Sequence, residues 1–264
     1  MIDFINAKNA FETYLDGYDR TNDKINLKIV HTYGVMDASF ELARRMSLSP
    51  EDTDLAGIIA LLHDIGRFEQ LKRFDSFQPD TMDHAAYGAE LLFKEGMIRQ
   101  FVEDSSFDSI IRDAILYHSM YQLPELKSSQ ALLHAKLIRD ADKLDNCRVK
   151  LQESVETLLG ASKEEVGKTS VTSKVAETFF RNECILSSDR VTKMDYWVSY
   201  IAYFFDINFS ESLSIIQEQD FVSRIIHRIP YSDPDTALLM SQMEHYMNEY
   251  VKKGARIPNE NTCN

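Results

Sequence analysis

The chain has 264 residues, of which 44% are hydrophobic and 27% are charged, a composition typical of a globular protein with a substantial core. Its formal net charge of −13 argues against a nucleic-acid polymer as the main partner, because phosphate backbones attract clustered Lys and Arg side chains. The three cysteines are too few and too scattered for a disulfide framework or a thiolate zinc site.

The sequence shows no targeting or membrane signal. Residues Met1 to Lys8 lack the basic and then apolar order of a signal peptide, and no apolar run approaches the roughly 18 residues needed to span a bilayer. We therefore expect a cytoplasmic protein without a membrane partner. Nothing in the sequence indicates an oligomeric state.

Helical periodicity dominates the first half of the chain. Apolar residues recur at three- and four-residue steps from Lys24 to Arg45, which predicts an amphipathic helix with His31 in its middle. Ser49-Pro50 is typical of a helix start, and the apolar run after it predicts a buried helix that ends at the His63-Asp64 pair.

Other segments before residue 150 are less uniform. Residues 66–82 lack a clean period and are predicted to form a loop with one helical turn. Further helices are expected around Ala10–Tyr14, Asp83–Leu92, Ile110–His118 and Ala131–Asp145.

The second half is also helical, and the alternating pattern of strands is nearly absent. We therefore predict an all-α fold, in which residues 1–150 form a metal-binding helical core and residues 151–264 form a helical extension packed on it. A polar linker is expected near residues 160–170. The predicted helical segments of the extension are Val171–Phe180, Val191–Phe205, Phe221–Ile226 and Pro234–Tyr250.

The His63-Asp64 pair is the feature from which a function can be inferred. It follows a run of apolar residues, so we expect the carboxylate to be buried, and Gly66 marks a turn directly after it. A buried carboxylate is costly unless a cation or hydrogen bonds compensate it. The pair therefore predicts a bound ligand.

Further histidine and aspartate residues fall on apolar faces or at the ends of predicted helices. Imidazole nitrogen and carboxylate oxygen, without thiolate, suit Mn, Fe, Co, Ni, Zn or Mg. Six candidates exceed the three or four ligands that one catalytic metal needs, and two metals about 3.5–4 Å apart would use them all. We therefore expect one or two divalent ions, with the candidate ligands His31, His63, Asp64, His84, His118 and Asp142.

The order of these residues resembles that of the HD superfamily of metal-dependent phosphohydrolases. His31, then His63-Asp64 followed by Ile-Gly-Arg, then Asp142 within Ala-Asp-Lys-Leu, match its ordered motif over roughly residues 24–148. The additional His84 and His118 resemble the subset that binds two metals. The resemblance implies a helical bundle that hydrolyses a phosphomonoester or phosphodiester of a small molecule, such as a nucleotide, with a metal-activated water.

The resemblance also implies roles for individual residues. Asp64 would bridge two metals, which activate water and spread the charge of the phosphoryl group. Arg67 would offer a forked donor to the phosphate, and Lys143 would add positive charge. The first metal would be held by His31, His63, Asp64 and Asp142, and the second by Asp64, His84 and His118.

One departure from the family narrows the substrate. Cyclic-dinucleotide phosphodiesterases of this type carry two successive histidines and a Gly-Tyr-Pro signature. Here Ser119 follows His118 and that signature is missing. Hydrolysis of cyclic dinucleotides is therefore not expected.

Two other functions fit the same ligands. A diiron oxygenase with an HD fold would use six His and Asp ligands equally well. A silent metal-binding or sensing module is also compatible, although a degenerate copy would tolerate the loss of ligands. His134, His227 and His245 match no position of the motif and are expected to be structural, and Asp83, Asp140 and Asp145 are expected to be surface charges or supporting groups.

Overall fold

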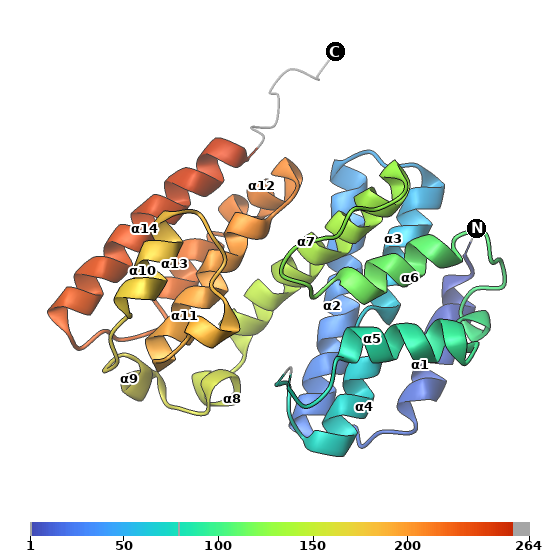
Figure 1. Cartoon of the computed structure of the whole chain (residues 1–264), viewed down its shortest axis with the longest axis horizontal. Helices are drawn as coiled ribbons and strands as arrows, with labels where there is room; N and C mark the ends of the chain where they lie inside the picture. The colour runs from blue at the N-terminus through green and yellow to red at the C-terminus, as the bar shows by residue number, and fades with distance from the viewer. Residues whose placement is uncertain (1, 79, 256–264) are drawn as a thin grey trace, which may run out of the picture. The chain divides into compact units, whose positions relative to one another are not determined.

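The computed structural model describes residues 2–78 and 80–255, and the regular elements among these residues are all helical. This confirms the predicted all-α fold (Figure 1). The helices before residue 153 are α1 (Phe4–Leu15), α2 (Asp23–Arg45), α3 (Pro50–Leu62), α4 (Ile65–Phe74), α5 (His84–Ala89), the π-helix η1 (Glu90–Lys94), the 3-10 helix η2 (Met97–Gln100), α6 (Asp108–Tyr117) and α7 (Ser129–Gln152).

Among the later helices of the described residues, only the last is longer than ten residues. They are α8 (Val155–Leu159), α9 (Lys163–Val166), α10 (Ser173–Phe180), η3 (Ser187–Asp189), α11 (Lys193–Ala202), η4 (Tyr203–Asp206), α12 (Ser210–Glu218), α13 (Phe221–Ile226) and α14 (Pro234–Gly254).

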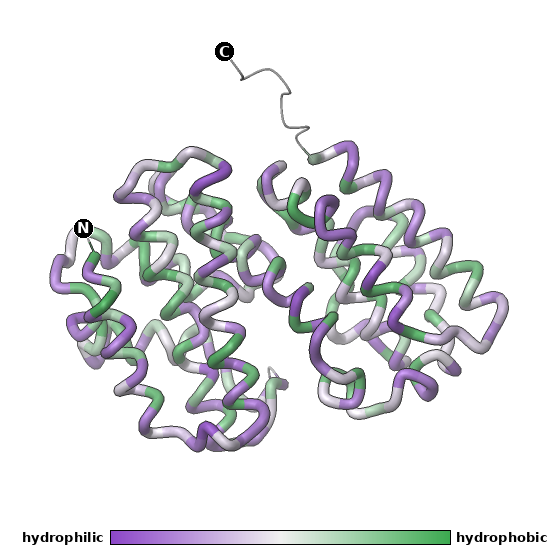
Figure 2. Tube along the Cα trace, turned by 180° about the vertical axis from the view of Figure 1, so that it is seen from behind, coloured by the Kyte–Doolittle hydropathy of each residue, from purple (hydrophilic) through white to green (hydrophobic). Residues whose placement is uncertain are grey.

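The chain divides into two compact units, Met1–Asp145 and Asn146–Asn264, and the division falls inside α7. Along the helices of each unit, polar and apolar stretches alternate (Figure 2), as expected where each helix turns one face to a core. Among the described residues, no helix combines the length and the apolar character needed to cross a membrane. The packing of the C-terminal helices on the N-terminal core stays a prediction.

Helix α3 is the centre of the first unit. All eight residues from Leu55 to Leu62 are buried, so this helix is apolar around its whole circumference and is covered by its neighbours. It packs against α2 along one side and against α6 and α1 on others. The His63-Asp64 pair, which directly follows the last turn of α3, therefore lies in the interior of the unit.

The predicted helix starts are confirmed by their caps. The side chain of Ser49 accepts a hydrogen bond from the backbone N–H of Asp52, with Pro50 at the first helical position. Asp83 accepts from the N–H of Ala86 and so begins α5. Each cap fixes the register of a helix that carries a candidate ligand.

The prediction of a loop over residues 66–82 was wrong for its first half. Residues up to Phe74 form α4, which buries Ile65, Phe68 and Leu71 at three-residue steps. The periodicity was missed because Ile65 lies before the predicted range, and the charged residues between the apolar ones hide the rest. Asp75 adopts a left-handed conformation (φ 46°) and ends the helix.

The second unit contains the four predicted helical segments, and its described residues also form α8, α9, η3 and α12, which were not predicted. Trp197 is fully buried. The buried carboxylate of Asp195 accepts hydrogen bonds from the backbone N–H groups of Thr172, Val191 and Thr192, so it ties the start of α11 to the start of α10. This unit supplies none of the six candidate ligands.

Candidate metal centre

His63 and Asp64 occupy the junction between α3 and α4. His63 follows the last residue of α3, its side chain is fully buried, and its Nδ1–H donates to the carbonyl oxygen of Ala60 at 2.7 Å. A carbonyl can only accept, so this bond leaves the lone pair on Nε2. That Nε2 atom is buried without a hydrogen-bond partner among the described residues. An orphaned imidazole nitrogen of this kind fits a metal ligand.

His118 is held by the same device at the end of α6. Its Nδ1–H donates to the carbonyl oxygen of Ile115 at 2.7 Å, which again directs Nε2 away from the helix. The guanidinium of Arg139, on α7, donates to the carbonyl oxygens of Tyr117, His118 and Met120. Arg139 therefore caps the C-terminus of α6 and fixes the position of His118.

His84 reaches the cluster because α4 and α5 approach very closely. A Cβ atom on Gly66 would lie 2.2 Å from the carbonyl oxygen of His84 and 2.8 Å from the nitrogen of Gly88. Only glycine permits this backbone contact. The Nε2 atom of His84 lies 3.2 Å from Nε2 of His118 and 3.2 Å from Oδ1 of Asp64.

His31 lies between two carboxylates of α7 that are one turn apart. Its Nδ1 lies 2.7 Å from Oδ2 of Asp145, and its Nε2 lies 3.0 Å from Oδ1 of Asp142. Gly34, one turn further along α2, leaves room for Asp145, since a Cβ there would lie 2.0 Å from Oδ1. Asp145 thus orients the ring from behind, and Nε2 faces the cluster with Asp142.

The two oxygens of Asp64 face different histidines. Oδ1 lies 3.2 Å from His84 Nε2 and 3.6 Å from His118 Nε2. Oδ2 lies 3.6 Å from His63 Nε2 and 3.9 Å from His31 Nε2. A carboxylate that bridges two cations needs this division of its oxygens between two sets of ligands.

All six predicted ligands therefore come together in one place. Two groups of ligand atoms lie within 4.8 Å of one another, His31, His63 and Asp142 in the first, and His63, Asp64 and His118 in the second. The side chain of Asp142 is 24% exposed, whereas that of Asp64 is 3% exposed. The cluster is thus accessible on the side of Asp142 and buried at Asp64.

Burial and charge set the protonation of the cluster without metal. Burial lowers the pKa values of both His63 and His84 to about 4, so these rings are neutral at pH 7 and ready to coordinate. Burial alone would raise the pKa of Asp64, but the Lys28 ammonium and the surrounding histidines together outweigh it, and the pKa lies well below its usual value. For Asp142 the hydrogen bond with His31, together with the charges of His31 and His63, likewise overcomes burial and lowers the pKa.

His31 differs from the other rings. Burial and Lys28 would lower its pKa, but hydrogen bonds with Asp142 and Asp145 prevail and raise it. Its ring is therefore stabilised in the charged form when no metal compensates the two carboxylates. A divalent cation beside Nε2 would replace that proton.

The two predicted phosphate-binding residues, Arg67 and Lys143, have different contacts. Arg67 is in the cluster: Nη2 lies 2.9 Å from His84 Nε2, and Nε lies 3.7 Å from Oδ1 of Asp64. Lys143 instead donates from Nζ to the carbonyl oxygen of Arg139 at 3.3 Å, one turn earlier in its own helix. Its catalytic role stays a prediction.

Lys28 was not predicted from the sequence as a residue of the site. Its side chain is 13% exposed, and Nζ lies 2.6 Å from Oδ2 of Asp64. The available signal was its spacing, because Lys28 precedes His31 by three residues and so lies on the same face of α2.

Two of the three histidines outside the motif contact carboxylates. His134 is buried and its Nε2 lies 3.1 Å from Oδ1 of Asp52, which joins α7 to α3. His227 pairs with Glu244 at 2.9 Å on the surface of the second unit. Both contacts agree with the structural roles expected for these residues.

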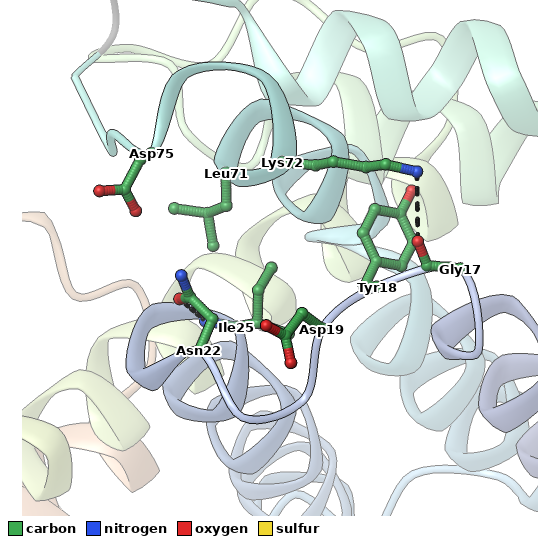
Figure 3. A pocket seen from close by; sticks show the side chains of 8 residues that line it. All are labelled: Gly17, Tyr18, Asp19, Asn22, Ile25, Leu71, Lys72 and Asp75. Carbon is green, nitrogen blue, oxygen red and sulfur yellow. Dashed lines mark hydrogen bonds between the residues drawn. The ribbon is translucent and has the colours of Figure 1, made fainter.

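A cavity of about 300 Å³ lies elsewhere in the first unit, between the turn before α2 and the end of α4. In Figure 3, Lys72 extends over Tyr18 and donates to the carbonyl oxygen of Gly17 at 3.2 Å. None of the six candidate ligands lines this cavity, which is formed by Gly17, Tyr18, Asp19, Asn22, Ile25, Leu71, Lys72 and Asp75.

Comparison with known families agrees with this geometry. Residues 29–147 match the model of the HD domain, a range that contains all six candidate ligands. Residues 29–147 therefore form an HD domain, a family whose members are generally metal-dependent hydrolases. Comparisons with curated proteins and with solved structures gave no match.

Proposed function

We propose that the protein is a two-metal phosphohydrolase that acts on a phosphate ester of a small molecule. The observation that carries this proposal is that the two carboxylate oxygens of Asp64 face different histidines. Oδ1 faces His84 and His118, and Oδ2 faces His63 and His31. Bound divalent cations would activate a water molecule and neutralise phosphoryl charge.

The chain's own residues prepare the site for this chemistry. Backbone carbonyls fix the rings of His63 and His118, and Asp145 fixes the ring of His31. These hydrogen bonds hold the three imidazoles in the orientation that faces the cluster. These imidazoles would bind cations without cancelling their charge, while Asp64 and Asp142 supply two negative charges. The sum leaves a positive site that favours a phosphate group, with Arg67 at its edge.

We expect phosphate release to require a divalent cation. Protein stripped with a chelator should be inactive, and reloading with Mn²⁺, Fe²⁺, Co²⁺, Ni²⁺, Zn²⁺ or Mg²⁺ should raise the rate by about a hundredfold or more for the metal that fits. The measurement is phosphate release from a panel of nucleotides, sugar phosphates and p-nitrophenyl mono- and diesters. Equal rates with and without metal would contradict the proposal, and so would oxygen uptake by the Fe²⁺-loaded protein without phosphate release.

A further inference from the structure

Lys28 is a buried cation in direct contact with the carboxylate proposed to bridge two metals. Its Nζ lies 2.6 Å from Oδ2 of Asp64, and only 13% of its side chain is exposed. Oδ2 is the oxygen that faces His31 and His63. The ammonium therefore supplies positive charge that the buried carboxylate requires.

This pair is not compatible with full occupancy of the cluster by divalent cations. A cation bound by His31, His63 and Asp64 would approach the same oxygen as the ammonium, and the two positive charges would repel each other in a poorly solvated site. Lys28 has a flexible four-carbon stem and can move its charge, unlike a fixed guanidinium fork. It would turn to the nearest available anion.

We propose that Lys28 is an exchangeable counter-ion, which neutralises Asp64 when metal is absent and binds the phosphoryl group of the substrate when metal is present. This inference rests on the proposed phosphohydrolase function. It assigns to a residue of α2 the role of second phosphate-binding cation beside Arg67.

Lys28 and Arg67 both lie near the ring of Phe77. Its ring centroid lies 5.7 Å from Lys28 Nζ and 6.0 Å from the guanidinium carbon of Arg67. Lys28 contacts Oδ2 of Asp64, and Arg67 lies near Oδ1. The two positive charges therefore flank the bridging carboxylate, where the phosphoryl group of a substrate would bind.

This arrangement favours a terminal phosphomonoester as substrate. A monoester presents three terminal oxygens and two negative charges, whereas a diester presents two such oxygens and one charge. Two metal ions together with Lys28 and Arg67 provide more positive charge and more donors than a diester can satisfy. We therefore expect monoesters to be hydrolysed in preference to diesters.

Substitution of Lys28 by Met tests the exchange. Without metal, Lys28→Met leaves Asp64 buried and uncompensated, so its melting temperature should fall by about 5 °C or more below that of the wild type. With saturating Mn²⁺ the two melting temperatures should agree, because the metal replaces the ammonium. The affinity of the Mn²⁺-loaded variant for inorganic phosphate, measured by calorimetry, should be at least about tenfold weaker than that of the wild type.

Lys24→Met is the matched control. Lys24 lies one turn earlier on α2, and its Nζ pairs with Oδ2 of Asp75 at 2.8 Å, away from the candidate ligands. This variant should keep the wild-type phosphate affinity and the wild-type increase in melting temperature on addition of Mn²⁺. Lys28→Arg, which keeps the charge, should recover part of the phosphate affinity.

The outcomes separate this inference from the function on which it rests. If the wild type hydrolyses esters but Lys28→Met loses equal stability with and without Mn²⁺ and binds phosphate normally, Lys28 is a fixed structural ion pair and the exchange is refuted. A wild type that prefers diesters refutes the substrate class alone. A wild type that binds none of Mn²⁺, Fe²⁺, Co²⁺, Ni²⁺, Zn²⁺ and Mg²⁺ overturns both proposals.

Discussion

Replacing Asp64 with Asn should reduce the rate of phosphate release by about a thousandfold or more. The amide keeps the shape of the side chain but removes the negative charge that faces both pairs of histidines. It also leaves the Lys28 ammonium without its partner. The measurement is the steady-state rate in saturating metal, together with metal content and the helical signal in circular dichroism.

Asp52→Asn provides the control for that substitution. Asp52 is also a carboxylate of the first unit with a histidine beside it, since its Oδ1 lies 3.1 Å from Nε2 of His134. The same oxygen accepts a hydrogen bond from the side-chain amide of Gln130 at 2.9 Å. It is not a candidate ligand, so the variant should keep the wild-type rate within about twofold. A folded Asp64→Asn variant with more than about a tenth of the wild-type rate would show that this carboxylate holds no catalytic metal.

Gly66→Ala should be the most destabilising single-methyl change in the candidate site. The new Cβ would lie 2.2 Å from the carbonyl oxygen of His84 and 2.8 Å from the nitrogen of Gly88, both backbone atoms that cannot rotate away. Helices α4 and α5 would have to separate, which we expect to cost about 3 kcal/mol or more in the free energy of unfolding. Urea unfolding measures the loss, and metal content should fall because His84 moves.

Gly17→Ala is the corresponding control, because the nearest atom to its new Cβ is the carbonyl oxygen of Tyr14 at 3.5 Å, an ordinary contact. Its free energy of unfolding should stay within about 0.5 kcal/mol of the wild type. If Gly66→Ala proved as stable as Gly17→Ala, the close approach of α4 and α5 would not be required for the fold.

The candidate ligands could be predicted from the sequence because each lies at a position that a local signal marks. His63 and His118 end helices whose apolar periods are clear, and Asp83 marks the start of the helix that carries His84. The order of these residues along the chain then added information that no single position contains. Their convergence is seen in the structure, while their roles as ligands stay a proposal.

The supporting residues could not be predicted because their roles depend on contacts between distant segments. Lys28 and Asp64 are 36 positions apart, and Asp145 reaches His31 across 114. The sequence placed Asp145 among surface or supporting charges without a partner. Gly34 and Gly66 are likewise required only because another helix lies close to them, and the periodicity of the sequence does not predict such a contact.

The error at residues 66–82 has a related cause. The buried positions Ile65, Phe68 and Leu71 of α4 are separated by charged residues, so the short apolar face is visible only when its first member is included. The helix matters for the site, because its first turn carries Gly66 and Arg67. A loop at this place could not have held Gly66 against the backbone of α5.

The central claim is that imidazoles and carboxylates from five separate parts of the first unit bind divalent cations together. The most direct measurement is the anomalous difference density of a crystal grown with Zn²⁺ and recorded at the zinc edge. We predict peaks about 2.0–2.2 Å from Nε2 of His63 and from an oxygen of Asp64. Peaks confined to surface carboxylates, with His63 Nε2 and Asp64 unligated, would contradict it.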